Sequence, residues 1–241
     1  FVSFGISETS VNDSVERHGT RFLLSSVVLT ILLYVIPYGS IIGYPLILLS
    51  TLAHEMGHGL AALLVGGDFH KFYLHSDASG VAYTSTQGNL AGAFVSAGGL
   101  VGPAIVGALF FAMAHRAKAL FFVLGFGLIL AEVFVVRNLF GLTFVGGVAI
   151  VFLWLASSAG KGLQQIAAYF VGIQLALSVF SRGDYLFTPT AQTASGAMPS
   201  DVAHIAEALF LPYWVWGGLC GAFSLFCLVV GVRSALNNLK E

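Results

Sequence analysis

Charged side chains are scarce in this chain of 241 residues: Asp, Glu, Lys and Arg together make up 9% of it, and hydrophobic residues make up 57%. Soluble domains carry about 25% charged residues, so a soluble fold of this length could not cover its surface with so few. The mean hydropathy of +0.90 points the same way. The composition therefore predicts an integral membrane protein, whose apolar surface faces lipid.

Neither sign of charge is in excess, and cysteine is rare. The formal net charge is −1, so the chain has no basic surplus for phosphates, and we expect no nucleic-acid partner. The two cysteines, Cys220 and Cys227, lie in one apolar run. A helix would hold them about 10 Å apart, too far for a disulfide, so we interpret them as packing residues.

Apolar runs near the length of a transmembrane helix recur along the chain. They lie at about 21–37, 41–65, 89–114, 119–136, 142–158, 162–180 and 211–232. They predict an all-α polytopic membrane protein, a bundle of about six to seven transmembrane helices that forms one domain over residues 1–241. Lys and Arg fall equally on the two sides of such a bundle, so they do not decide its orientation.

Polar segments separate these runs. Residues 1–20 have no signal-peptide core, and we expect an N-terminal arm there; Phe1 in the place of Met suggests a processed or truncated start. Apolar and polar residues alternate within 67–87, which predicts a short β-hairpin after the second helix. The longest polar segment, 181–208, is expected to be re-entrant or interfacial.

The second apolar run contains the sequence His-Glu-Met-Gly-His at residues 54–58. On a helix, His54 and His58 lie one turn apart and project from one face, so both imidazoles can bind one metal ion. Glu55 is adjacent to that face, where it can take a proton from a metal-bound water. Imidazole pairs favour Zn²⁺ for hydrolysis, although the spacing alone does not exclude other metals.

The His-Glu-x-x-His pattern also arises by chance in helices. In a soluble chain, a chance match and a metal site would have about equal odds. Ionisable side chains inside a membrane span are costly, however, and are functional by default. Three of them lie within five residues of this apolar run. The membrane context therefore favours the metal interpretation.

With this motif, residues 50–83 resemble the site-2 protease family of intramembrane zinc metalloproteases. The likeness is to a bacterial subgroup with H-E-x-G-H, a Gly-Gly pair, a strand-like hairpin and then a glycine-rich helix. Later stretches at 172–175, 200–203 and 211–214 extend the resemblance over most of 50–220. It implies a helical membrane bundle, in a bacterial inner membrane, that cleaves the transmembrane segments of other proteins.

The resemblance also implies a third zinc ligand, an Asp on a later membrane helix, usually in an Asp-Gly pair. This sequence has no Asp-Gly pair. Asp201, in a Ser-Asp pair that matches the subgroup, is the first candidate, followed by Asp184 and Glu132. Each has another interpretation: Asp201 could cap a helix over 202–209, Asp184 could be a solvated loop carboxylate, and Glu132 could pair with a nearby arginine, Arg137.

Two further polar residues have open roles. His204 lies three residues after Asp201 on the same helix face, so it could assist the site or lie on the helix surface. Asn138 resembles a residue that family members place near the substrate backbone, and a loop turn explains it equally well. If Asp201 is a ligand, the polar segment must fold back toward bilayer depth, which is allowed only where it is buried in protein or lines a wet cavity.

Our first hypothesis is a zinc metalloendopeptidase that hydrolyses peptide bonds in or near substrate transmembrane segments by zinc-activated water. In it, Zn²⁺ is the cofactor, held by His54, His58 and Asp201, and Glu55 is the catalytic base. The partners are a membrane-protein substrate segment, the lipid bilayer and other subunits of a membrane complex. The alternative is a noncatalytic family relative that serves as a structural or assembly subunit; a metal transporter is disfavoured, because one isolated site gives no row of ligands across the bilayer.

Overall fold

The computed structural model describes residues 21–32, 35–36, 39–181, 186–193 and 196–238. In this part of the chain, five helices are long and apolar enough to cross a membrane: α2 (Gly39–Leu64), α3 (Asn89–Ala112), α4 (Ala117–Phe134), α5 (Leu139–Ser158) and α8 (Tyr213–Asn238). A shorter helix, Arg21–Leu32, and α6 (Lys161–Ser181) account for the other two apolar runs. The all-α polytopic membrane fold is therefore confirmed. The expected arm at 1–20 lies outside the described residues.

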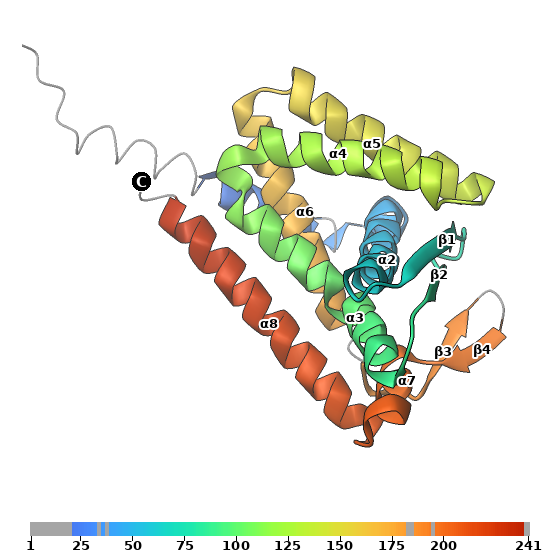
Figure 1. Ribbon diagram of the computed structural model, residues 1–241. Helices are drawn as coiled ribbons and strands as arrows, with labels where there is room; N and C mark the ends of the chain where they lie inside the picture. Colours follow the sequence, from blue (N-terminus) through green and yellow to red (C-terminus); the bar gives the residue numbers. More distant parts are fainter. Residues whose placement is uncertain (1–20, 33–34, 37–38, 182–185, 194–195, 239–241) are drawn as a thin grey trace, which may run out of the picture.

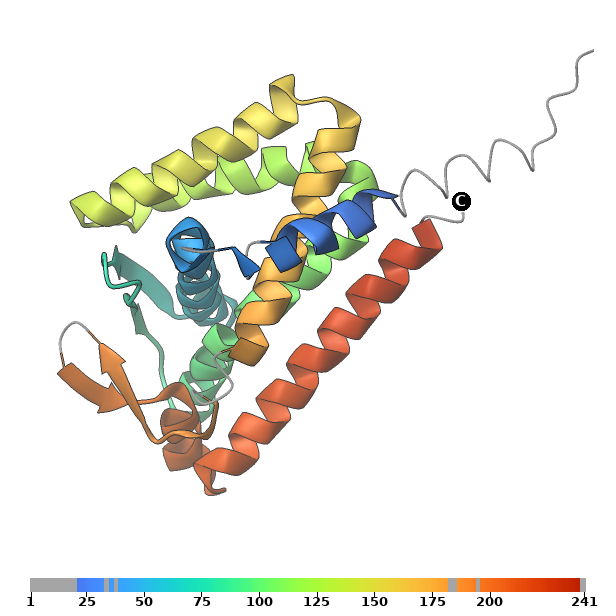
Figure 2. The ribbon, with the colours of Figure 1, turned by 180° about the vertical axis from the view of Figure 1, so that it is seen from behind.

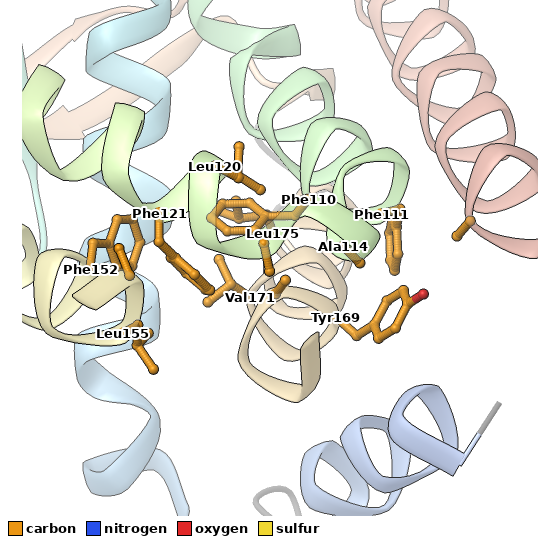
Figure 3. Close-up of a cluster of buried hydrophobic side chains, with 14 of the residues drawn as sticks. Phe110, Phe111, Ala114, Leu120, Phe121, Phe152, Leu155, Tyr169, Val171 and Leu175 are labelled. Carbon is orange, nitrogen blue, oxygen red and sulfur yellow. The ribbon is translucent and has the colours of Figure 1, made fainter. Parts of the chain in front are cut away.

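Helix α3 lies at the centre of the arrangement. It contacts α2, α6, α7 (Asp201–Leu209) and α8. Figures 1 and 2 show α8 running beside α3, while α4 and α5 pair with each other beyond the C-terminal end of α3. A cluster of buried side chains from α3, α4, α5 and α6 fills that end, and Phe110, Phe121 and Phe152 pack ring against ring within it (Figure 3).

Helices α2 and α3 touch through their backbones. A Cβ atom added at Gly102 would lie 2.8 Å from the carbonyl oxygen of Ala53, and one added at Gly98 would lie 2.8 Å from that of Gly57. Small residues permit such close approach in lipid, where burial of apolar surface gives helices little reason to associate. This contact fixes the position of α2 and of the motif that it carries.

The predicted β-hairpin is present between α2 and α3. Strand β1 (Asp68–Leu74) pairs antiparallel with β2 (Gly80–Ser85). Its turn is tied to α2, because the Thr51 hydroxyl donates to the carbonyl of Ala78 at 2.9 Å. The hairpin therefore runs back alongside α2 rather than out into solvent.

The segment between α4 and α5 covers the other edge of β1. The backbone N–H of Phe72 donates to the carbonyl of Val135, and that of Arg137 donates to the carbonyl of Phe72. The side chain of Asn138 continues the pairing: its Nδ2 donates to the carbonyl of Leu74 at 2.6 Å, and its Oδ1 accepts from the Leu74 N–H at 3.2 Å. Asn138 therefore holds the hairpin in place.

The polar segment at 181–208 contains more regular structure than its sequence suggested. Strands β3 (Thr190–Thr193) and β4 (Gly196–Pro199) form a second antiparallel hairpin, and α7 follows directly. The residue that caps α7 is Ser200, whose hydroxyl oxygen accepts from the N–H of Ala203. The alternative that Asp201 is the cap is therefore wrong: Asp201 is the first residue of α7.

Candidate metal centre

The imidazoles of His54 and His58 both project from helix α2 toward the same place. The two Nε2 atoms of His54 and His58 lie 3.2 Å apart, and the rings are perpendicular with centroids 4.7 Å apart. This arrangement follows from the helical spacing, because positions i and i+4 are neighbours on one face. Two nitrogen donors therefore converge, as the sequence predicted.

Helix α7 brings a carboxylate to the same point. Asp201 Oδ2 lies 3.2 Å from Nε2 of His54, and Oδ1 lies 3.4 Å from Nε2 of His58. All three side chains are less than a fifth exposed. The start of α7 is held rigidly, because the buried hydroxyl of Ser200 donates to the carbonyl of Thr188 at 2.6 Å, while Val202 and Ile205 are buried against α3 and α8.

The donor atoms of the three residues lie at separations close to those found around a metal ion. A tetrahedral zinc ion has bonds of about 2.0–2.1 Å to nitrogen and oxygen, so its ligand atoms lie about 3.3 Å apart. The two Nε2 atoms are 3.2 Å apart, and they lie 3.2 and 3.4 Å from the two different oxygens of the Asp201 carboxylate. Two imidazoles and one carboxylate leave a fourth position open, which is the pattern of catalytic rather than structural zinc sites. The donors present therefore fit a zinc ion.

A backbone carbonyl sets the tautomer of His58. Its Nδ1 lies 2.9 Å from the carbonyl oxygen of Val95. Because a carbonyl can only accept, Nδ1 carries the proton, and Nε2 of the neutral ring is left with a lone pair directed at the other two donors. Gly99 makes room for the ring, since a Cβ atom there would overlap it. Helix α3 thereby orients one donor of the group.

Glu55 is buried between α2 and β2. Only 6% of it is exposed, and its side chain lies against Gly80, where an added Cβ would come within 2.7 Å of the Glu55 Cγ. It lines a cavity of about 300 Å³ together with His54, His58 and Asp201. Since a water molecule takes about 30 Å³ of liquid volume, the cavity has room for several waters or a short stretch of peptide.

The other candidates from the sequence lie elsewhere. Glu132 is on α4 and faces Gly146 of α5, where an added Cβ would lie 3.0 Å from its carboxylate oxygens. Its suggested partner, Arg137, instead donates to carbonyls at the end of α4. Asp184 lies outside the described residues. His204 lines the cavity, whereas Asn138 binds β1 as described above.

Sequence reasoning missed one wall of the cavity. Ala191, Met198 and Pro199, all from the β3–β4 hairpin, line it. The signal for this hairpin was present but weak: threonines at 188, 190 and 193 favour strand, and the glycine at 196 is typical of a turn.

The family model described as Peptidase M50B-like matches residues 24–231. The matched region includes all of α2 and α7, and therefore His54, Glu55, His58 and Asp201. No curated protein and no solved structure matches the chain.

Proposed function

Because the chain belongs to the Peptidase M50B-like family of site-2 proteases, we propose that it is an intramembrane zinc metalloprotease that hydrolyses peptide bonds in or next to transmembrane segments of its substrates. The observation that carries the proposal is the triangle formed by the donor groups of His54, His58 and Asp201: the two Nε2 atoms are 3.2 Å apart, and each lies within 3.4 Å of one oxygen of the Asp201 carboxylate. Membrane helices around this triangle support a substrate that is itself in the membrane.

In this proposal, His54, His58 and Asp201 hold the zinc ion. The ion would supply a Lewis acid that polarises a peptide carbonyl and makes a water molecule acidic enough to lose its proton near neutral pH. The Asp201 carboxylate would offset part of the ion's charge at a site whose three donor side chains are each less than a fifth exposed. The Val95 carbonyl keeps the lone pair of His58 Nε2 available.

Glu55 would move the proton. Its carboxylate lines the same cavity as the three donors, so it can accept a proton from the attacking water and deliver it to the amine nitrogen that leaves when the C–N bond breaks. Burial against Gly80 restricts its side chain to few positions. A base held in one place is what general base catalysis requires.

We further propose that an unwound substrate segment adds to the outer edge of β2. Phe72 directs both its N–H and its C=O away from β2, toward Val135 and Arg137. Its partner in register is Ala82, and paired residues of an antiparallel ladder share one pattern. Ala82 therefore directs its N–H and C=O to the other side, where no strand of the described chain pairs with them. Ala82 also lines the cavity beside Glu55.

This edge could hold a substrate by main-chain hydrogen bonds alone. A helical peptide shields its carbonyls within its own hydrogen bonds, so a protease acting in lipid must receive its substrate unwound. An extended strand on β2 would carry its peptide bonds past Glu55 and the three donors.

The test compares zinc content and cleavage of a transmembrane reporter substrate in the purified chain. We expect about one zinc ion per molecule, and a Glu55→Gln variant that keeps the metal but loses at least about 100-fold in turnover. Glu132→Gln is the matched control, since it removes a carboxylate from another span, and it should keep both properties.

A noncatalytic subunit would give a different result. The wild-type chain would then cleave no better than Glu55→Gln, with or without bound zinc. That outcome would overturn the protease proposal in favour of a structural or assembly role.

A further inference from the structure

A second cavity, of about 700 Å³, lies far from the donor triangle, at a corner where several helices end. The 3-10 helix η1 (Ala114–Arg116) connects α3 to α4 there, and the same corner holds the C-terminal end of α5 and the N-terminal end of α6. Because α3, α4 and α5 are long and apolar enough to cross a membrane, we place this corner, where they begin or end, at a boundary between lipid and water.

Positive charge is concentrated in this cavity. Arg116, Lys118 and Lys161 line it and are all exposed, which is three of the ten Lys and Arg residues of the chain. Among the described residues, no carboxylate lines the cavity, and none forms an ion pair with these three side chains. The cavity therefore has cationic groups with no counter-charge from the described protein.

An apolar wall continues from the charged end. Phe122 and Val123 of α4 also line the cavity, and they are 59% and 66% exposed. Ala114, Ala117 and Ala156 line it as well, and they are buried members of the hydrophobic cluster, of which Figure 3 labels Ala114. A ligand seated here would meet cations at one end and hydrocarbon along its length.

The frame of the cavity is fixed by hydrogen bonds. The buried Gln164 donates through Nε2 to the carbonyl of Leu155 at 2.8 Å and to that of Ala159 at 3.1 Å, which locks the turn between α5 and α6. Asn238 of α8 donates to the carbonyl of Ala112 at 3.0 Å, at the end of α3. Side-chain hydrogen bonds therefore hold the backbone around the three cations in place.

We propose that this corner binds an anionic phospholipid, with the phosphate of the head group between Arg116, Lys118 and Lys161 and an acyl chain along Phe122 and Val123. A guanidinium and two ammonium groups are the side chains that recognise phosphate, and basic pockets between membrane helices bind anionic head groups. The exposed apolar wall favours a lipid over a free phosphate ion, because a phosphate ion has no hydrocarbon chain to pack against it.

The test is native mass spectrometry of the full chain, stripped of lipid in neutral detergent and titrated with phosphatidylglycerol, phosphatidylcholine or inorganic phosphate. Lys118→Gln/Lys161→Gln removes two charges from the cavity. Arg21→Gln/Arg233→Gln is the matched control, because it removes two exposed charges that do not line the cavity. Lys118→Arg/Lys161→Arg keeps the charges and reports on any folding defect.

We expect phosphatidylglycerol to bind the wild type more tightly than phosphatidylcholine, and inorganic phosphate not to displace it. The cavity variant should bind phosphatidylglycerol about 25-fold more weakly, at about fivefold for each charge removed, while the control and the Arg variant stay within about twofold. Equal losses in the cavity and control variants, no loss in either, or displacement of the lipid by inorganic phosphate would each overturn the proposal.

Discussion

The side chain of Glu55 has room in its position only because residue 80 is a glycine. A Cβ atom on Gly80 would lie 2.7 Å from the Glu55 Cγ and 2.8 Å from the Thr51 Cγ2. We therefore predict that Gly80→Ala displaces the Glu55 carboxylate and lowers turnover about 10- to 100-fold, because small misplacements of a catalytic group are costly. Zinc content should not change, since no donor atom is touched.

The matched control for this substitution is Gly92→Ala. Gly92 lines the same cavity, but a Cβ atom there would have no neighbour within 4 Å. Cleavage assays and zinc analysis of the two variants should separate them, with Gly92→Ala within about twofold of wild type. Full turnover in Gly80→Ala would mean that the position of Glu55 does not limit the reaction.

Single residues differed in how far the sequence could predict them. His54, Glu55 and His58 lie on one helix, so their spacing alone fixed their relative positions. Asp201 lies on another helix, far along the chain, and no local pattern links it to α2. Only the family resemblance favoured it over Asp184 and Glu132, and the structure brings it to the two imidazoles. That it binds a metal there stays a prediction.

At the level of elements, the free edge of β2 makes a prediction about substrate binding. Ala82→Pro removes the N–H that points away from β1, so it should weaken strand addition while leaving the ladder to β1 in place. We expect cleavage of the reporter to fall at least about tenfold, at unchanged zinc content. The measurement is the cleavage rate at several substrate concentrations.

Ala82→Val is the control for this effect, because it keeps the N–H and favours an extended strand. It should cleave the reporter at close to the wild-type rate. If Ala82→Pro also cleaves normally, substrates do not bind by pairing with β2, even though the metal centre remains intact.

Elements that face lipid were easier to predict than those that surround the site. A long apolar run predicts each transmembrane helix, and the alternation of apolar and polar residues predicts the first hairpin. The second hairpin is short, and all four residues of β4 are exposed, so β4 lacks the alternation that marks a half-buried strand. The two ends of this hairpin are joined by hydrogen bonds from Ser200 to the carbonyls of Thr188 and Pro189, and no local pattern in the sequence indicates these bonds.

Across the whole molecule, the proposed zinc ion would connect α2 to α7, two helices otherwise separated by most of the chain. A ligand that binds only the folded state stabilises it, by about 2.7 kcal/mol at a free concentration 100 times its Kd. We therefore predict that zinc raises the midpoint of thermal unfolding in detergent and that a chelator reverses the shift.

The control is the Asp201→Ala variant, which removes one donor. Its midpoint should respond little to zinc, whereas the Glu132→Ala variant should respond like the wild type. An equal response in Asp201→Ala would show that zinc binds elsewhere on the chain.

The fold class followed from composition, but the arrangement of the helices did not. Lipid solvates every apolar face equally well, so hydropathy does not say which helices are neighbours. Two kinds of contact determine which helices pack together. One is close backbone contact, such as Gly98 against Gly57, and the other is the buried hydrogen bond, such as that from Gln174 to Thr30 at 2.9 Å. Such pairs can be recognised only once both partners are known.

X-ray absorption at the zinc edge, on the purified chain loaded with one equivalent of zinc, tests the metal centre most directly. The structure predicts two imidazole nitrogens and at least one carboxylate oxygen at about 2.0–2.2 Å, and loss of this signature in Asp201→Ala, which should bind the ion poorly. A shell of sulfur atoms, a single imidazole, or a spectrum unchanged in Asp201→Ala would contradict a zinc site built from His54, His58 and Asp201.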